Sequence, residues 1–173
     1  MILYHGTTEH RARLILRDNC IKKDVERYFT EEYNGDGYST QGYIYLTNEI
    51  TFAVYFANCH KFVDKSTNIY VFKIDMPPQL IEPDYDELRY QSATDEEINS
   101  YGGPLKCSLL EYKACRVKTD INFDRFSVQY CVLPITDTIG NLLDNAGCNY
   151  KYVVTHYTKA QREFINNINW INL

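Results

Sequence analysis

Hydrophobic and polar positions alternate along several short stretches of the chain, and these stretches predict β-strands. Each stretch is rich in β-branched and aromatic residues and is bounded by polar or turn-forming residues. The strands are expected at Met1–Tyr4, Tyr43–Thr47, Asn68–Asp75, Ser108–Lys118, Phe126–Ile135 and Lys151–Tyr157. Since strands outnumber helices and do not alternate regularly with them, the pattern predicts an α+β fold.

Apolar residues at helical spacing predict helices between these strands. The residues His5-Gly6-Thr7-Thr8 are expected to end the first strand as a turn. Thr8 is expected to cap a helix over about Glu9–Asn19, and Thr47 or Asn48 to cap a helix over Glu49–His60. Two further helices are expected, at Asp95–Ser100 and Thr158–Trp170.

The remaining segments are polar and predict loops. Cys20–Gly42 forms a long loop, residues 80–106 form an acidic segment that ends in a turn, and residues 137–149 form a third loop. The length of 173 residues indicates one domain, 1–173, with a core over about 2–135 and a C-terminal strand and helix at about 150–170.

Composition and charge narrow the class of protein. Hydrophobic residues make up 45% of the chain and charged residues 24%, which is typical of a folded globular protein. The net charge of -5 disfavours a broad basic face for duplex DNA. The six cysteines form no CxxC pair and no Cys/His metal spacing, so we expect no structural metal. Because the chain shows no signal peptide, we expect them to be free thiols in a reducing compartment. Without a signal-like or membrane-spanning segment, a cytoplasmic location is expected.

Three separated segments carry candidate chemistry when they are taken together. They are Leu3-Tyr4-His5-Gly6-Thr7, then Gly42-Tyr43-Ile44-Tyr45-Leu46-Thr47 followed by Phe52-Ala53-Val54-Tyr55-Phe56-Ala57, and finally Leu110-Glu111-Tyr112. Over about residues 2–126 their order and character resemble the His-Tyr-Glu class of ADP-ribosyltransferases, the clan of poly(ADP-ribose) polymerases and diphtheria-type toxins. The resemblance implies a split antiparallel sheet with flanking helices around an NAD+ cleft.

The chemistry of that clan explains why these residue types are needed. Transfer of ADP-ribose breaks the glycosidic bond to a positively charged leaving group, through a transition state like an oxocarbenium ion. The resemblance implies that His5 hydrogen-bonds a ribose hydroxyl, that Tyr45 stacks on nicotinamide and that Glu111, at the front of a strand, stabilises the developing positive charge. These three residues are the expected catalytic group, and no metal is expected.

The expected NAD+-binding residues are His5, Gly6, Thr7, Tyr43, Tyr45, Thr47 and Ala53. Tyr43 and Tyr45 share one face of a strand, so Tyr43 competes for the stacking role. Other polar residues compete for the role of Glu111, namely Asp120 and Gln129 nearby and the acidic-segment residues Glu87, Glu96 and Glu97. The acidic segment is expected to face water.

Some departures and alternatives follow from the motifs. Arginine-directed members of the clan carry Glu or Gln two residues before the catalytic Glu, where this chain has Leu109, so modification of arginine is disfavoured. The motifs around His5 and Tyr45 are also similar to those of RNA 2′-phosphotransferases, which need an additional N-terminal module. A third alternative is a catalytically inactive module that binds a nucleotide or a partner.

The acceptor of ADP-ribose is expected to be RNA or single-stranded DNA, ahead of protein. Basic and aromatic residues interleave in the polar segment 21–41, and this combination suits phosphate pairing and base stacking. They are Lys22, Lys23, Arg27, Tyr28, Phe29, Tyr33 and Tyr38, with a second basic cluster at Lys113, Arg116, Lys118 and Arg125. The resemblance also implies an intracellular bacterial toxin of toxin–antitoxin or phage-defence type, with an antitoxin protein as a partner and no role for a membrane.

Overall fold

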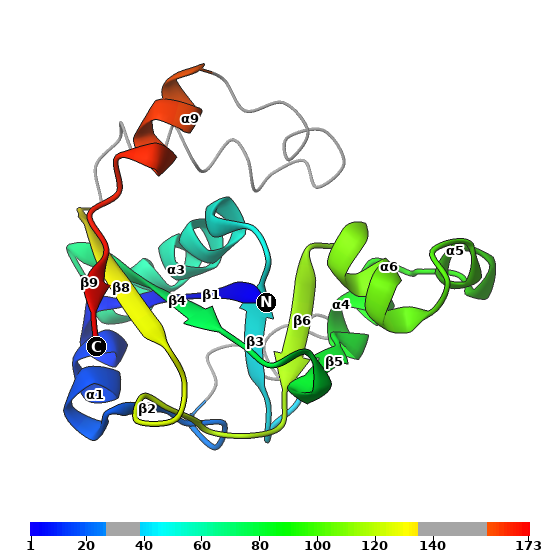
Figure 1. The fold of residues 1–173 in the computed structure, drawn as a ribbon, viewed down its shortest axis with the longest axis horizontal. Coiled ribbons are helices and arrows are strands. Elements are labelled where there is room, and N and C mark those ends of the chain that lie inside the picture. The colour runs from blue at the N-terminus through cyan, green and yellow to red at the C-terminus, as the bar shows by residue number, and fades with distance from the viewer. Residues whose placement is uncertain (27–38, 135–158) are drawn as a thin grey trace.

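The computed structural model describes residues 1–26, 39–134 and 159–173, and its centre is an antiparallel sheet of seven strands (Figure 1). In spatial order the strands are β5 (Ile81–Pro83), β6 (Ala114–Val117), β3 (Ile44–Thr47), β1 (Ile2–Thr8), β4 (Asn68–Asp75), β8 (Val128–Pro134) and β9 (Ile171–Asn172). A separate two-stranded sheet pairs β2 (Cys20–Ile21) with β7 (Ile121–Asn122). The predicted α+β class is confirmed.

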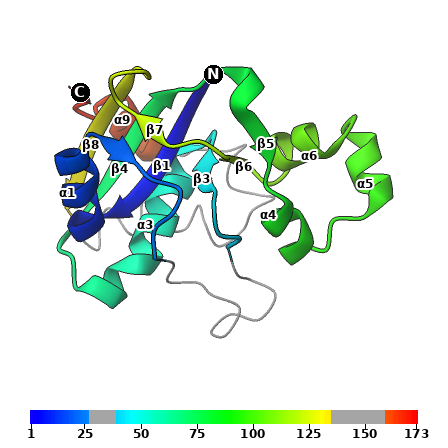
Figure 2. The same cartoon turned by 90° about the horizontal axis from the view of Figure 1, so that it is seen from below.

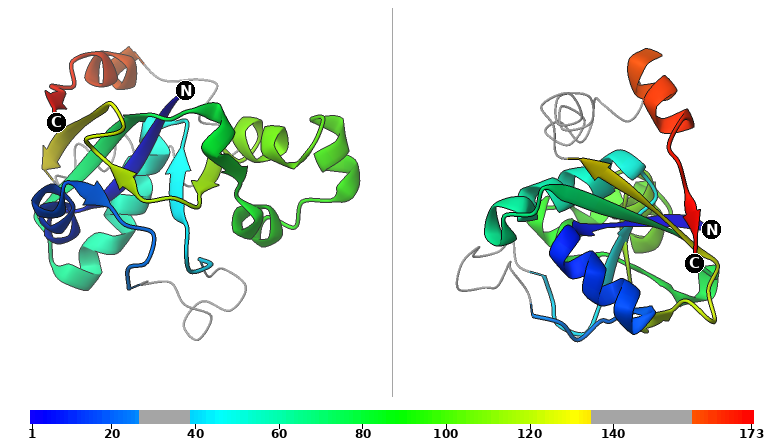
Figure 3. Two further views of the ribbon diagram at one scale, coloured as in Figure 1. Left: turned by 60° about the horizontal axis from the view of Figure 1, so that its bottom comes forward. Right: turned by 90° about the vertical axis from the view of Figure 1, so that its left-hand side faces the viewer.

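Helices cover both faces of the central strands. Phe72 and Ile74 of β4 pack in one cluster with α1 (Glu9–Asp18), and Ile69 and Val71 pack in a second cluster with α3 (Ile50–Asp64) and α9 (Lys159–Asn166). The right-hand view of Figure 3 shows α1 (blue) below the strands and α9 (red) above them. Because β4 is buried on both faces, it has the nearly continuous apolar sequence that made it easy to predict.

The sheet almost divides between β1 and β3. Every residue of β1 pairs with β4, but β1 pairs with β3 only through Tyr4 and Thr47. The two strands run in clearly different directions from this point (Figure 1). The halves β5-β6-β3 and β1-β4-β8-β9 therefore diverge, and the divergence opens space beside β1.

The acidic segment forms a small helical lobe between β5 and β6. The lobe follows the 3₁₀ turn η2 (Pro78–Leu80) and contains α4 (Tyr85–Tyr90), α5 (Asp95–Ser100) and α6 (Pro104–Leu110). It projects from one end of the molecule (Figure 2). Leu88, Cys107 and Tyr112 form its own small core. Only α5 was predicted, with the observed bounds.

Two predicted elements near the candidate motifs differ in the structure. The first strand continues through His5 and Gly6 to Thr8, where a turn was predicted, because β4 offers a partner to every residue of β1. The predicted strand Ser108–Lys118 is a helix up to Leu110 and a strand only from Ala114. Pro104 starts that helix and Lys113, with φ 57°, turns the chain into β6.

The predicted helix caps also differ in detail. Thr8 is the N-cap of α1, but its hydroxyl makes no cap and instead donates to Asp64. Glu49 is the N-cap of α3, and Thr47 accepts the backbone N–H of Glu49 at 3.0 Å.

The C-terminal predictions are only partly within the described residues. The last helix is shorter than predicted, since α9 ends at Asn166, and the chain then adds β9 beside β8. The predicted strand Lys151–Tyr157 and the loop 137–149 lie outside the described residues.

Candidate functional site

A cleft of about 1080 Å³ opens where β1 and β3 diverge. Its walls come from β1, α1, β3, α3 and α4. All the predicted NAD+-binding residues line it, namely His5, Gly6, Thr7, Tyr43, Tyr45, Thr47 and Ala53. Segments far apart in the sequence therefore meet at one site.

His5 connects the two diverging strands. Its ring nitrogen Nδ1 lies 3.0 Å from the backbone carbonyl oxygen of Tyr45, just beyond the pairing of Tyr4 with Thr47. A carbonyl oxygen only accepts hydrogen bonds, so Nδ1 carries the proton in this contact. In the neutral ring, Nε2 is then the nitrogen with a lone pair.

Gly6 allows α3 to approach β1 closely. A Cβ atom at this position would lie 1.7 Å from the carbonyl oxygen of Ala53, which no side chain can tolerate. Ala53 is itself buried. The glycine and the small residue on the following helix are therefore explained by packing, and this packing forms one wall of the cleft.

Each of the two tyrosines of the second motif has a distinct partner. The Tyr45 hydroxyl donates to the carboxylate of Asp86 and lies 3.1 Å from the carbonyl oxygen of Thr40. Burial and the hydrogen bond to Asp86 raise the pKa of Tyr45, so the phenol stays protonated. The Tyr43 ring is covered by the Arg116 guanidinium, 3.9 Å from its centre.

Glu111 lies at the end of α6 and does not line the cleft. It was predicted at the front of a strand, but it has helical backbone angles and accepts a hydrogen bond from the Tyr101 hydroxyl. Its neighbours Tyr112 and Lys113 do line the cleft. The structure thus does not bring Glu111 together with His5 and Tyr45.

The structure instead places three carboxylates of the acidic segment in the cleft wall. Asp84, Asp86 and Glu87 lie at the start of α4 and line the cleft, where a water-facing segment was expected. Asp84 is the N-cap and accepts the backbone N–H groups of Asp86 at 3.1 Å and Glu87 at 3.0 Å. A capping aspartate followed by acidic residues was the sequence signal for this short helix.

The environments of these carboxylates move their pKa values in different directions. Burial raises the pKa of Asp84 to about 7, partly offset by the hydrogen bond from Glu87. Burial also raises the pKa of Glu87, and Gln91 opposes this by donating to Glu87 at 2.8 Å. Burial alone would raise the pKa of Asp86, but hydrogen bonds from Tyr45 and Thr40 outweigh it and lower the pKa.

The opposite wall of the cleft is basic. Arg11, Arg17 and Lys22, from α1 and the segment after β2, line the cleft there. Asp18 accepts from Arg17 at 2.8 Å and from Lys22 at 2.7 Å, and Glu26 also lines this wall, so the three cations outnumber two carboxylates by one charge. The largely apolar cleft therefore carries charged groups at two places, with carboxylates on α4 and most of the cations beside α1.

The two predicted basic clusters are only partly available to an acceptor. Lys22 and Lys113 line the cleft, whereas Lys23 is paired with Asp24. Arg116, named as a member of the second basic cluster, is buried, with 7% of its area exposed. Five members of the first cluster lie outside the described residues, namely Arg27, Tyr28, Phe29, Tyr33 and Tyr38.

Metal and disulfide chemistry find no support in the described part of the chain. No group of His, Cys, Asp or Glu within it has the arrangement of a metal site. Cys20, Cys107, Cys115 and Cys131 are free thiols. No helix in the described ranges is both long and apolar enough to cross a bilayer.

Comparisons of the chain with protein-family models, with curated proteins and with solved structures find no match.

Proposed function

We propose that this protein is an ADP-ribosyltransferase that cleaves NAD+ and transfers ADP-ribose to a macromolecular acceptor. The observation that carries the proposal is the meeting of His5, Gly6 and Tyr45 in one cleft, at the place where the sheet divides. The fold proposed with this function is the split sheet of the ADP-ribosyltransferase clan.

The charge distribution of the cleft supports a dinucleotide such as NAD+. NAD+ has a positively charged nicotinamide ring and a negatively charged pyrophosphate. Glu87 of α4 lines one wall and the cations Arg11 and Lys22 line the other, whereas Asp84 is buried and Asp86 faces two arginines. Such a cleft favours a ligand whose positive end lies near the carboxylate and whose negative end lies near the cations.

In the proposed reaction the bond between C1′ of the ribose and the nicotinamide nitrogen breaks. Its electron pair leaves with nicotinamide, which becomes neutral, and C1′ becomes cationic. His5 binds a ribose hydroxyl through Nε2, and Tyr45 flanks the nicotinamide ring. A carboxylate of α4 stabilises the cation, in the role first given to Glu111. An oxygen or nitrogen of the acceptor then bonds to C1′ and gives its proton to a base of the cleft.

The acceptor is proposed to be nucleic acid, ahead of protein. The interleaved cations and aromatic residues of segment 21–41 support this choice, and Lys22 brings that segment to the edge of the cleft. The proposed biological role is that of a growth-arresting toxin. Induced expression should then stop growth, and His5→Ala should relieve the arrest.

Incubation of the purified protein with labelled NAD+ tests the activity. We expect release of nicotinamide and transfer of label to RNA or single-stranded DNA, with both lost in His5→Ala. Asp75→Asn is the matched control, because Asp75 is exposed and pairs with the N-terminal amine away from the cleft. Wild-type protein that neither binds nor consumes NAD+ would contradict the proposal. Removal of a 2′-phosphate from RNA would instead support the phosphotransferase alternative.

A further inference from the structure

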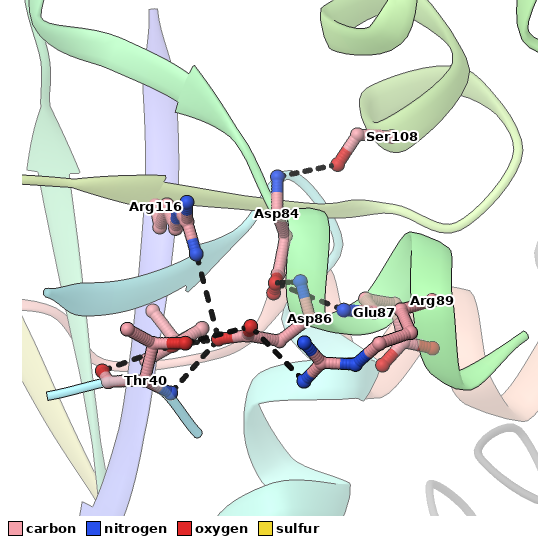
Figure 4. A network of polar contacts seen from close by, with 8 residues as sticks. Thr40, Asp84, Asp86, Glu87, Arg89, Ser108 and Arg116 are labelled. Carbon is pink, nitrogen blue, oxygen red and sulfur yellow. Dashed lines mark hydrogen bonds and ion pairs between the residues drawn. The ribbon is translucent and has the colours of Figure 1, made fainter. Parts of the chain in front are cut away.

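Asp86 joins the helical lobe to the strand that carries the two candidate stacking tyrosines. It lies in the first turn of α4 and is only 8% exposed. Oδ2 accepts from the Tyr45 hydroxyl and from the Thr40 backbone N–H at 2.9 Å, and Oδ1 accepts from the Thr40 hydroxyl at 2.8 Å. Figure 4 shows the contacts from Thr40 reaching the carboxylate of Asp86.

Two arginines complete the surroundings of Asp86. Arg116 of β6 approaches Oδ2 at 3.4 Å, and Arg89 of α4 approaches Oδ1 at 3.3 Å (Figure 4). Arg116 also stacks on Tyr43 and is the register partner of Tyr45 across β3 and β6. Asp86 therefore contacts Tyr45 directly and Tyr43 through Arg116.

These contacts distinguish Asp86 from its acidic neighbours Asp84 and Glu87 in the cleft wall. Each oxygen of Asp86 already accepts from at least two donors of the protein, and the site is buried. Because both of its oxygens accept hydrogen bonds from protein groups, this carboxylate orients neighbouring side chains and does not bind a ribose. It also fixes the rotamer of the Tyr45 ring, because the phenol oxygen is tied at the far end of the side chain.

We infer that Asp86 is the positioning residue of the cleft, which holds the Tyr45 ring in place to stack on the nicotinamide of NAD+. This role rests on the proposed function. Asp86 keeps the ring in the orientation that binds NAD+ before the ligand arrives. Its loss should weaken ligand binding more than the chemical step, because the groups that react with C1′ are elsewhere in the cleft.

The test compares Asp86→Asn, Tyr45→Phe and the double variant with wild type and with Asp75→Asn. Asp86→Asn should raise KM for NAD+ by about tenfold or more and change kcat less. Tyr45→Phe keeps the ring and removes only the phenol contact, so it should raise KM in the same way. If both act through one contact, the double variant should be no worse than the more impaired single variant.

The outcomes separate this role from the proposed function. Wild-type protein without NAD+ binding or cleavage overturns the proposed function, and this role with it. If the wild type is active, two results would overturn the positioning role of Asp86 alone. One is that the effects of Asp86→Asn and Tyr45→Phe on KM are additive in the double variant, and the other is that Tyr45→Phe keeps the wild-type KM. Tyr45→Phe decides the matter alone if Asp86→Asn fails to fold, because it leaves the charge of Asp86 opposite Arg116.

Discussion

The Nδ1 atom of His5 lies 3.0 Å from the backbone carbonyl oxygen of Tyr45, across the gap between two strands that are otherwise joined at a single pair of residues. A side chain thus replaces the backbone pairing that β1 and β3 give up beyond Tyr4 and Thr47. The contact fixes the imidazole ring where β1 and β3 separate. Nδ1 then has the structural role, and Nε2 has the proposed role of binding a ribose hydroxyl.

Substitution of His5 can separate these two roles. The side-chain amide of Asn places a donor near the position of Nδ1, whereas nothing in Asn replaces Nε2. His5→Asn should therefore keep the free energy of unfolding within about 0.5 kcal/mol of wild type, as for a retained contact. It should nevertheless lose NAD+ cleavage in a nicotinamide-release assay. An active His5→Asn variant would remove Nε2 from the proposed mechanism.

Gly6 should be intolerant of any side chain. Because an added Cβ would meet the Ala53 carbonyl oxygen at 1.7 Å, Gly6→Ala must push α3 away from β1. We expect it to lower the free energy of unfolding by about 3 kcal/mol or more, measured by urea denaturation.

Gly42→Ala is the control for Gly6→Ala. Gly42 has φ 85°, and an added Cβ would meet only Asp24 Oδ1, at an ordinary contact distance of 3.9 Å, so substitution there introduces only backbone strain of about 1 kcal/mol. Equal effects of the two substitutions would contradict the packing explanation for Gly6.

The sequence predicted the strands that have apolar residues on both faces or strict alternation. The strand Asn68–Asp75 has the predicted bounds, and Ile44–Thr47 lies within its predicted range. His5–Thr8 was predicted as a turn because its Gly and Thr residues are typical of turns. What makes it a strand is β4, more than sixty residues away, and no local pattern contains that information.

The helical lobe was harder to predict for a different reason. α4 and α5 have six residues each and α6 has seven, which is too few turns to establish a helical period. The Leu109-Leu110-Glu111-Tyr112 run has the composition of a strand, so Glu111 was placed at the front of one. The caps Asp84 and Thr94 were the available signals, and both accept backbone N–H groups as the sequence rules require.

Asp84 should make the stability of the protein depend on pH. Its pKa is raised to about 7 by burial, against about 3.9 for an unfolded aspartate. The folded protein therefore binds the proton more tightly, and the stability that this provides is lost as the pH rises from about 4 through about 7.

Asp84→Asn tests this dependence, because Asn caps helices as well as Asp does and carries no charge. Between pH 5 and pH 8 the wild type should lose more stability in urea denaturation than the variant. The variant should be the more stable of the two at pH 8. Parallel pH profiles for the two proteins would show that Asp84 does not retain its proton in the folded state.

Two isosteric substitutions test which carboxylate serves the reaction. Glu87 lines the cleft, is half-buried and accepts from the neutral amide of Gln91. Burial raises its pKa, as expected of a carboxylate facing a low-dielectric cleft. Glu111 lies outside the cleft lining and accepts from Tyr101. Glu87→Gln should lower kcat for nicotinamide release by about 100-fold, the scale for losing one electrostatic group at a reacting centre.

Glu111→Gln should lower kcat much less, and its main effect should be on stability, because it weakens the contact with Tyr101 inside the lobe. Thermal unfolding of both variants identifies any loss of activity that comes from misfolding. The reverse order of effects on kcat, with both variants folded, would return the catalytic role to Glu111. It would also require α6 to move during catalysis, because Glu111 does not line the cleft in this structure, although the next two residues, Tyr112 and Lys113, do.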